Sequence, residues 1–251
     1  MNKGGAYEET AVLYRSNAQS RAIEEALLRI SIPYRIYGGL RFYERLEIKN
    51  AIAYLKIIFN NNDNPSFERS ISNPTRGVGE KTLGKIRQTA QKYNISYIKA
   101  SAKLIDEGSI SGRGGSGLRD YLEFVAGCKS FIEDNSLSDL MELIIKESGL
   151  YSYHAKEAGE KGKTRTENLE ELITATKNFE QSVKEDKTNT EIAENYLDVI
   201  SLDAGDRQAA EHDDAAQLMT MHSAKGLEFK LVLLTGLEES LFPHGRSMAV
   251  S

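Results

Sequence analysis

Residues 220–229 read TMHSAKGLEF and lie between two apolar runs, AAQLMTMHSA (215–224) and FKLVLLTGLEES (229–240). Short runs rich in branched apolar residues predict β-strands. Between them, Lys225 and Gly226 place a cation and a permissive turn residue at the end of a strand, where α/β folds bind phosphate-bearing ligands. The stretch therefore predicts an α/β fold that contacts the phosphate of a nucleotide or of a nucleic acid. A plain solvent-exposed turn is the alternative.

The N-terminal region has the complementary pattern. ETAVLYRS (9–16) reads as a strand, NAQSRAIEEALLRI (17–30) has apolar residues at helical spacing, and PYRIYGG (33–39) reads as a second strand closed by glycines. A strand, a helix and a strand in this order favour a parallel sheet covered by helices. We therefore expect the two ends of the chain to contribute strands to one sheet.

The middle of the chain shows almost only helical periodicity. Apolar residues recur at i, i+3 and i+4 in the segments 47–59, 80–93, 95–105, 117–132, 137–150, 164–183 and 189–202. Thr164 and Glu167 match a capping box, which predicts a helix start at this point. The expected architecture is α/β with mostly helical content: a partial parallel-sheet domain in two segments, 1–43 and 214–251, that carries a large all-helical insertion, 44–213.

Composition limits the class of protein. The chain has 251 residues, of which 40% are hydrophobic and 27% charged, as in soluble globular proteins. No apolar run approaches the roughly 18 to 20 residues that span a bilayer, and the N-terminus lacks the apolar core of a signal peptide, so we expect a cytoplasmic protein without a membrane partner. The single cysteine, Cys128, is expected in the core, and no metal site is predicted.

Positive charge is concentrated in one window. The chain has a net charge of −5, but residues 73–119 hold nine basic residues against three acidic ones, a local net charge of +6. The basic residues are Arg76, Lys81, Lys85, Arg87, Lys92, Lys99, Lys103, Arg113 and Arg119. Such a window is typical either of the solvated faces of amphipathic helices or of a nucleic-acid contact.

Glycines in this window favour the nucleic-acid contact. TRGVGEKTLGKI (75–86) has two glycines one residue apart just before a predicted helix. Glycines let the backbone approach a phosphate closely, and N–H groups at a helix start point at it, as in a helix-hairpin-helix element that holds duplex DNA without reading its sequence. SGRGGSGLRD (111–120) predicts a second glycine-rich turn before a helix. A plain tight turn is the alternative for either segment.

The sequence lacks the parts of a self-sufficient ATPase. The phosphate-loop pattern G-x-x-x-x-G-K-[ST] does not occur in it, and no separate acidic strand end offers a site for Mg²⁺. We therefore expect no ATP hydrolysis and no assigned catalytic residue in this chain.

The stretches QLMTMHSAKGLEF (217–229) and VLLTGLEESLFP (232–243) resemble motif V and its continuation in the UvrD/PcrA/Rep group of superfamily 1 DNA helicases. The resemblance covers about residues 8–247, because further segments follow in the family's order: 11–27, 33–55, 73–83 and 159–176. It implies that the chain is part of the second RecA-like motor domain, 2A, with the complete inserted subdomain 2B. The tail SMAVS (247–251) departs from the family's expected continuation, and the resemblance therefore implies either a truncated chain or an interrupted reading frame.

The resemblance also implies an activity and its partners. The intact enzyme would be an ATP-dependent 3′ to 5′ DNA helicase of repair or replication, with ATP and Mg²⁺ as cofactors that this chain alone is not expected to bind tightly. The implied partners are DNA with a duplex and a single-stranded tail, the missing first motor domain, and repair proteins. A different hypothesis is that the helical insertion acts as a protein-interaction or autoinhibitory module without strong DNA binding of its own.

Roles of single residues follow from the same resemblance. The implied nucleotide contacts are Gly226 and Glu228, although Glu228 also fits a simple surface carboxylate. The implied single-strand contacts are Arg15, Asn17, His222, Lys225 and His244. The predicted contacts to duplex DNA are Thr75, Arg76, Gly77, Val78, Gly79, Lys81, Thr82 and Arg113. For Arg15, a structural role beside the helix is the alternative.

Overall fold

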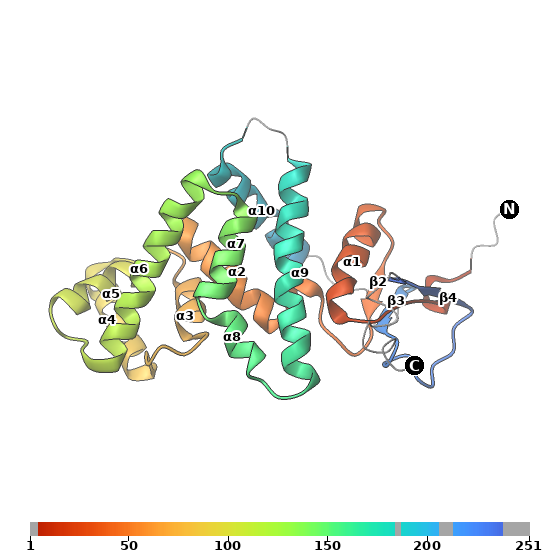
Figure 1. Cartoon of the computed structure of the whole chain (residues 1–251), viewed down its shortest axis with the longest axis horizontal. Coiled ribbons are helices and arrows are strands. Elements are labelled where there is room, and N and C mark those ends of the chain that lie inside the picture. Colours follow the sequence, from red (N-terminus) through yellow and green to blue (C-terminus); the bar gives the residue numbers. More distant parts are fainter. Residues whose placement is uncertain (1–4, 184–186, 206–212, 238–251) are drawn as a thin grey trace, which may run out of the picture. The chain divides into compact units, whose positions relative to one another are not determined.

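The computed structural model describes residues 5–183, 187–205 and 213–237 (Figure 1). Its contacts divide the chain into two compact units: unit 1 comprises Met1–Arg45 and Leu202–Ser251, and unit 2 comprises Leu46–Ser201. The predicted fold class is confirmed, because the described residues are mostly helical and include a small parallel sheet. The domain boundaries expected at residues 44 and 213 stay predictions, since residues 206–212 lie outside the described part of the chain.

Unit 1 is built on a four-stranded parallel sheet with the strand order β2-β3-β1-β4. Both ends of the chain contribute to it, as expected: β1 (Thr10–Tyr14), β2 (Tyr34–Ile36), β3 (Ala216–Thr220) and β4 (Leu231–Leu234). Val12 pairs with Leu218 on one side and with Leu233 on the other. The N-terminal and C-terminal segments are thus held together by backbone pairing rather than by side chains alone.

One helix covers a face of this sheet. Helix α1 (Ser20–Arg29) packs Ile23, Leu27 and Leu28 against a buried cluster that includes Val12 and Leu218. A short 3₁₀ turn, Asn17–Gln19, precedes α1, and a capping box formed by Ser16 and Gln19 starts it. Two more 3₁₀ turns lie at Tyr7–Glu9 and Phe42–Glu44. The predicted capping region at residues 17–20 therefore serves the 3₁₀ turn that leads into the helix.

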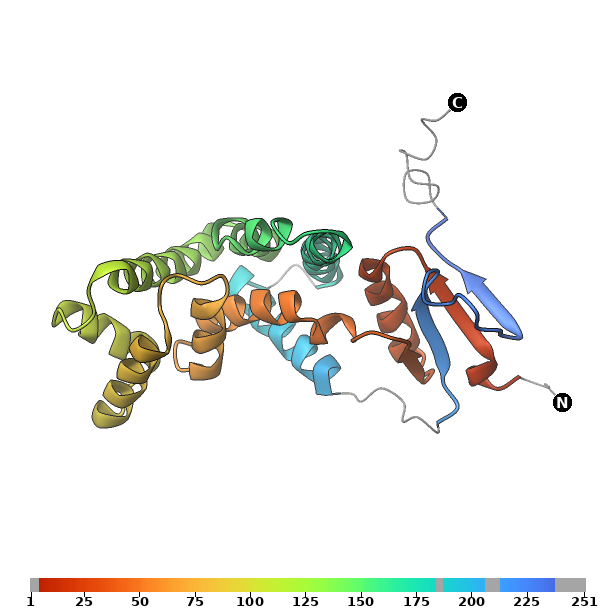
Figure 2. The same cartoon turned by 90° about the horizontal axis from the view of Figure 1, so that it is seen from below.

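Unit 2 is entirely helical in its described residues (Figures 1 and 2). Its helices are α2 (Leu46–Phe59), α3 (Asn64–Ser72), α4 (Glu80–Tyr93), α5 (Tyr97–Asp106), α6 (Gly112–Asp134), α7 (Leu137–Glu147), α8 (Leu150–Ala155), α9 (Glu160–Ser182) and α10 (Asn189–Gly205). Helix α2 is apolar on almost every face and packs against α3, α6, α7 and α9. It is the central helix of the unit, as an all-round hydrophobic helix must be.

An aromatic cluster links α2, α3 and α6. The rings of Phe67 and Tyr121 meet edge to face at 5.5 Å, and Tyr54 lies 6.1 Å from Tyr121. The hydroxyl of Tyr54 donates to the carbonyl oxygens of Ser70 and Asn73, at 2.6 and 2.9 Å. The core of unit 2 therefore reaches the C-terminal end of α3 and the loop that follows it.

Several sequence-based boundaries were wrong. Helix α9 begins at Glu160 rather than at Thr164, because Gly159 adopts φ +73° and interrupts the chain ahead of it. The helix predicted at 137–150 ends at Glu147, ahead of Gly149 with φ +86°, and α8, which begins at Leu150, was not predicted. Helix α3 was not predicted. No helix of the described residues is long and apolar enough to cross a membrane.

Candidate nucleic-acid interface

The loop between α3 and α4 is the first candidate surface. Gly77 has φ +76°, a conformation that side-chain-bearing residues rarely adopt, and Gly79 is the N-cap of α4 in an extended conformation. Both glycines and Thr75 are exposed, whereas the side chain of Val78 is buried and anchors the loop. The predicted position of GVG directly ahead of a helix is therefore confirmed.

Unpaired amides follow in a continuous run. In the described part of the chain, the backbone N–H groups from Gly77 to Lys81 donate to no acceptor. The first amides of α4 with a partner are those of Thr82 and Leu83, which donate to the carbonyl oxygen of Gly79 at 2.9 and 3.0 Å. Free amides at a helix N-terminus carry partial positive charge and can bind an anion. The loop offers them on an exposed surface.

Only part of the basic window stays available for an anion. Arg87 pairs with Glu68 and Glu80, Lys103 pairs with Glu107 at 2.6 Å, and Lys85 donates to the carbonyl oxygen of Ser109 at 2.9 Å. The exposed basic side chains of this window with neither an ion pair nor a side-chain hydrogen bond to any described residue are Lys81, Lys92, Lys99, Arg113 and Arg119. Sequence counting overstated the free charge, because acidic side chains pair with two of the cations, Arg87 and Lys103, and a carbonyl oxygen accepts from Lys85.

Arg76 does not face outward as the sequence led us to expect. Its guanidinium donates to the carbonyl oxygens of Ser70, Pro74 and Ser148, at 3.2, 2.9 and 2.7 Å. It also lies over the rings of Tyr54 and Tyr121, with centroid distances of 5.5 and 5.6 Å. The side chain is thus occupied beneath the loop, and the predicted phosphate contact would require it to leave these partners.

The second glycine-rich segment is a helix rather than the predicted turn. Residues 112–117 form the first turns of α6, and two of their glycines, Gly114 and Gly117, face the first loop. A Cβ atom at Gly117 would overlap the carbonyl oxygen of Arg76, and one at Gly114 would lie 3.1 Å from the carbonyl oxygen of Gly77. These glycines allow two backbones to approach each other. Arg113, on the same helix, is exposed beside Gly77.

The second candidate surface is the carboxyl edge of the sheet in unit 1. Arg15 follows β1 and His222 follows β3, so the parallel pairing of these strands brings them together. Nη1 of Arg15 lies 3.3 Å from Nδ1 of His222. The turn after β3 is held by Thr220, whose hydroxyl accepts the N–H of Ser223 at 3.2 Å. Two residues predicted to contact single-stranded DNA are therefore neighbours in the fold.

A buried polar cluster holds the segment that carries Arg15 and Asn17, and sequence reasoning missed it. Arg45 donates to the carbonyl oxygen of Asn17 at 2.9 Å and to the hydroxyl of Ser20 at 2.6 Å. Glu24 accepts from the same hydroxyl at 2.7 Å. No local pattern of residues indicated that Arg45 and Glu24 lie inside the fold.

The other described residues predicted on the turn after β3 add no side-chain contact to the Arg15–His222 pair. Lys225, Gly226 and Glu228 are exposed on the turn after β3, and neither Lys225 nor Glu228 pairs with a charged partner among the described residues. Gly226 has φ +86°, so the turn needs glycine here. His244 lies outside the described residues.

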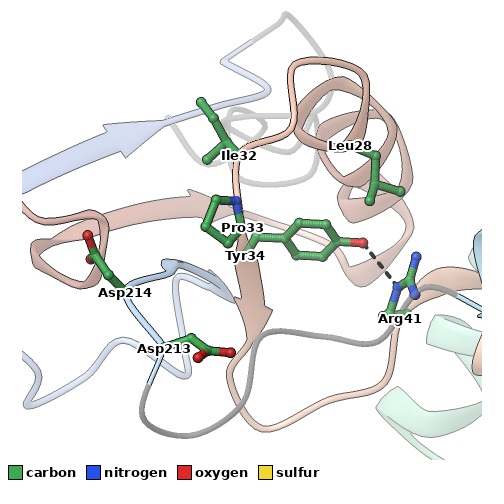
Figure 3. Close-up of a pocket in the computed structure, with 7 residues that line it drawn as sticks. All are labelled: Leu28, Ile32, Pro33, Tyr34, Arg41, Asp213 and Asp214. Carbon is green, nitrogen blue, oxygen red and sulfur yellow. Dashed lines mark hydrogen bonds between the residues drawn. The ribbon is translucent and has the colours of Figure 1, made fainter.

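A separate pocket of about 280 Å³ lies in unit 1, lined by Leu28, Ile32, Pro33, Tyr34, Arg41, Asp213 and Asp214 (Figure 3). Its cation is already satisfied, because Nε of Arg41 donates to the hydroxyl of Tyr34 at 3.0 Å and lies 3.9 Å from Glu24. The pocket contains no predicted site residue. The described residues also contain no group of three or more His, Cys, Asp or Glu side chains that could hold a metal ion.

Comparison with known proteins identifies the family. The model of the UvrD-like helicase C-terminal domain matches residues 1–110 and 120–250. The chain belongs to this family. Both candidate surfaces of this UvrD-like helicase C-terminal domain lie within the matched ranges, with one exception. The glycine-rich start of α6, which includes Arg113, falls between the two ranges.

Relatives of this UvrD-like domain are whole helicases. The chain is 47% identical over 247 residues to DNA helicase II of Escherichia coli, covering 98% of this chain and 34% of the relative. It is 46% identical over 246 residues to DNA helicase II of Haemophilus influenzae, covering 97% and 33%. It is 38% identical over 242 residues to the ATP-dependent DNA helicase PcrA of Bacillus subtilis, covering 96% and 32%. The chain thus spans about a third of the length of these curated relatives.

Proposed function

We propose that this UvrD-like domain is part of an ATP-dependent 3′ to 5′ DNA helicase of repair or replication, and that its own task is to hold the DNA backbone. The observation that carries the proposal is the run of unpaired amides from Gly77 to Lys81, whose residues are exposed apart from Val78, with the side chains of Lys81 and Arg113 beside it. The names of its relatives, DNA helicase II and ATP-dependent DNA helicase PcrA, support the same reading.

On duplex DNA, the loop between α3 and α4 works as a helix-hairpin-helix contact. The amides of Gly77 and Gly79 donate to phosphate oxygens, and the open space around Gly79 lets the sugar-phosphate chain approach. Lys81 and Arg113 add charge, with Thr75 and Thr82 as hydroxyl donors. Because these groups meet only phosphates, binding depends on salt and not on base sequence.

On single-stranded DNA, the carboxyl edge of the sheet supplies the contact. Arg15 and His222 are 3.3 Å apart, so one phosphate can accept a hydrogen bond from each. Asn17 and Lys225, which follow the same two strands in the chain, are included in the proposal, and His244 belongs to it as well. A contact built from two strands moves with the sheet, which suits a motor domain that passes movement to its DNA.

In the intact enzyme, ATP and Mg²⁺ would bind at the motor domains, with Gly226 and Glu228 facing the nucleotide. The exposure of both residues fits a contact to the sugar. Bound ATP supplies the free energy that closes the two motor domains. This chain holds no phosphate loop, so the phosphates and the metal need residues of the first motor domain, its principal partner.

A second candidate function is protein interaction or autoinhibition. The observation that favours it lies in unit 1 and not in the helical insertion: the β4 residues Leu231, Val232, Leu233 and Leu234 are between 42% and 51% exposed. Exposed apolar strands are typical sites of protein contact. Repair proteins would be the partners in that case.

Salt-dependent DNA binding tests the proposal. We expect Lys81→Ala to weaken binding to a duplex with a single-stranded tail, and to reduce the slope of log K against log salt by about 0.9, because one phosphate contact is lost. The effect should be the same for unrelated base sequences. Lys177→Ala, a change of another exposed lysine on α9, is the matched control. Wild-type binding that is absent or insensitive to salt would favour the interaction module instead.

A further inference from the structure

The side chain of Arg76 ties together three parts of unit 2. Its guanidinium binds the end of α3 through Ser70, the loop itself through Pro74, and the segment after α7 through Ser148. Backbone carbonyl oxygens at the ends of helices need donors when they are buried. Arginine suits this position, because its planar fork can serve several carbonyl groups at once.

The rings beneath the guanidinium add to this hold. Tyr54 and Tyr121 lie 5.5 and 5.6 Å from it, and both rings are fully buried. The hydroxyl of Tyr54 donates to the carbonyl oxygen of Ser70, which also accepts from Arg76. No carboxylate of the described residues pairs with Arg76. Its charge is therefore balanced by carbonyl dipoles and aromatic faces.

The main chain of Arg76 is held from the opposite side. Helix α6 comes so close at Gly117 that a Cβ atom there would overlap the carbonyl oxygen of Arg76. The unpaired amides begin at the next residue, Gly77, whose own carbonyl oxygen lies against Gly114. The unpaired amides thus directly follow Arg76, a residue whose side chain and backbone are both held by neighbouring segments.

We propose that Arg76 is a positioning residue for the loop between α3 and α4 and not a phosphate ligand. Gly117 serves the same purpose, because its lack of a side chain lets α6 approach the backbone of Arg76 closely. The inference rests on the proposed function for its meaning in DNA binding. Arg76 holds the amides of Gly77 and Gly79 where a phosphate can bridge them, and α6 limits how far the loop can move away.

Conservative variants separate positioning from direct contact. Lysine at position 76 would keep the charge but lose the fork and the stacking. If Arg76 met a phosphate, Arg76→Lys would keep most of the affinity. If Arg76 instead positions the loop, the Arg76→Lys variant should bind duplex DNA about tenfold more weakly than the wild type. Its salt slope should equal that of the wild type. Gly117→Ala adds one methyl group and no charge, and should weaken binding in the same way.

The matched control is Gly127→Ala on the same helix, where a Cβ atom would meet nothing within 4 Å. Affinities are measured on the whole chain, well below each variant's midpoint of thermal unfolding, so a smaller folded fraction cannot account for the loss. Wild-type affinity for Arg76→Lys or for Gly117→Ala would overturn the inference.

A second readout does not depend on DNA. The ¹H–¹⁵N NMR signals of Gly77 and Gly79 should move in Arg76→Lys and in Gly117→Ala, and should stay in place in Gly127→Ala. Unmoved signals would overturn the inference even if DNA binding fell. Absence of duplex binding by the wild type, with signals that move as expected, would instead reject the proposed function and leave the positioning role of Arg76 standing.

Discussion

Two basic side chains, one on either side of the GVG turn, are used in opposite ways. Lys81 is exposed and has no ion pair with a described residue, while Arg76 turns inward to three carbonyl oxygens. Both stand beside glycines in the same short segment, and both add equally to the local charge. The difference arises from shape: arginine can satisfy several buried acceptors with one planar group, and lysine cannot.

Cys128 gives a prediction at this scale. Its thiol is buried in α6, and burial raises its pKa to about 12. At pH 8 the thiol therefore stays protonated in the folded chain, whereas in the unfolded chain its pKa returns to an ordinary value. We expect alkylation by iodoacetamide at pH 8 to be slow, and fast in concentrated urea, as measured by mass spectrometry. Rapid alkylation without urea would show that the thiol is accessible.

Helix ends are where the elements of this chain depart from their sequence patterns. Helix α6 begins at Gly112, ahead of the apolar periodicity at 117–132. Its first turns pack closely against the loop between α3 and α4, and this backbone contact outweighs the low helix propensity of glycine. Helix α9 begins ahead of the apparent capping box at Thr164 for a similar reason: Gly162 lies against the carbonyl oxygens of His154 and Glu157.

The N-terminus of α3 provides a test at the scale of an element. Asp63 caps it, accepting the N–H of Ser66 at 2.9 Å and the hydroxyl of the same residue at 2.7 Å. We expect Asp63→Ala to lower the free energy of unfolding by about 1 kcal/mol, measured by urea denaturation. Asn61→Ala, at an exposed position just outside the cap, is the control and should change stability far less. Equal effects would show that the cap contributes little.

The two units differ in how the chain builds them. Unit 2 is one continuous stretch, Leu46–Ser201, whereas unit 1 needs segments from both ends of the chain to complete its sheet. The contacts that hold Arg76, from Ser70 to Ser148 and Gly117, all lie inside unit 2. A continuous stretch that contains its own core can fold alone.

We therefore predict that residues 46–201, expressed without the rest of the chain, fold and bind duplex DNA. Circular dichroism should show a helical protein that unfolds cooperatively in urea. Its duplex affinity should lie within about tenfold of that of the whole chain. A fragment that shows no cooperative transition would mean that unit 2 depends on unit 1 for its stability.

Local patterns of residues were enough for the fold class, the strand at each end of the chain and most helices. Alternating and helical patterns of apolar residues involve only near neighbours in the sequence, so they can be recognised without knowledge of any tertiary contact. The GVG turn could be predicted for the same reason. The function of the family was likewise legible from the quoted motifs, and the family match agrees with it.

Long-range packing settled which side chains remain free to bind. Arg76 meets the carbonyl oxygen of Ser148, 72 residues away, and Arg15 meets His222, 207 residues away. Neither partner can be inferred from neighbouring residues, because the partner of a polar atom depends on where distant segments pack. Charge and helix propensity belong to the residues themselves, whereas burial, pairing and close backbone approach exist only once the chain has folded.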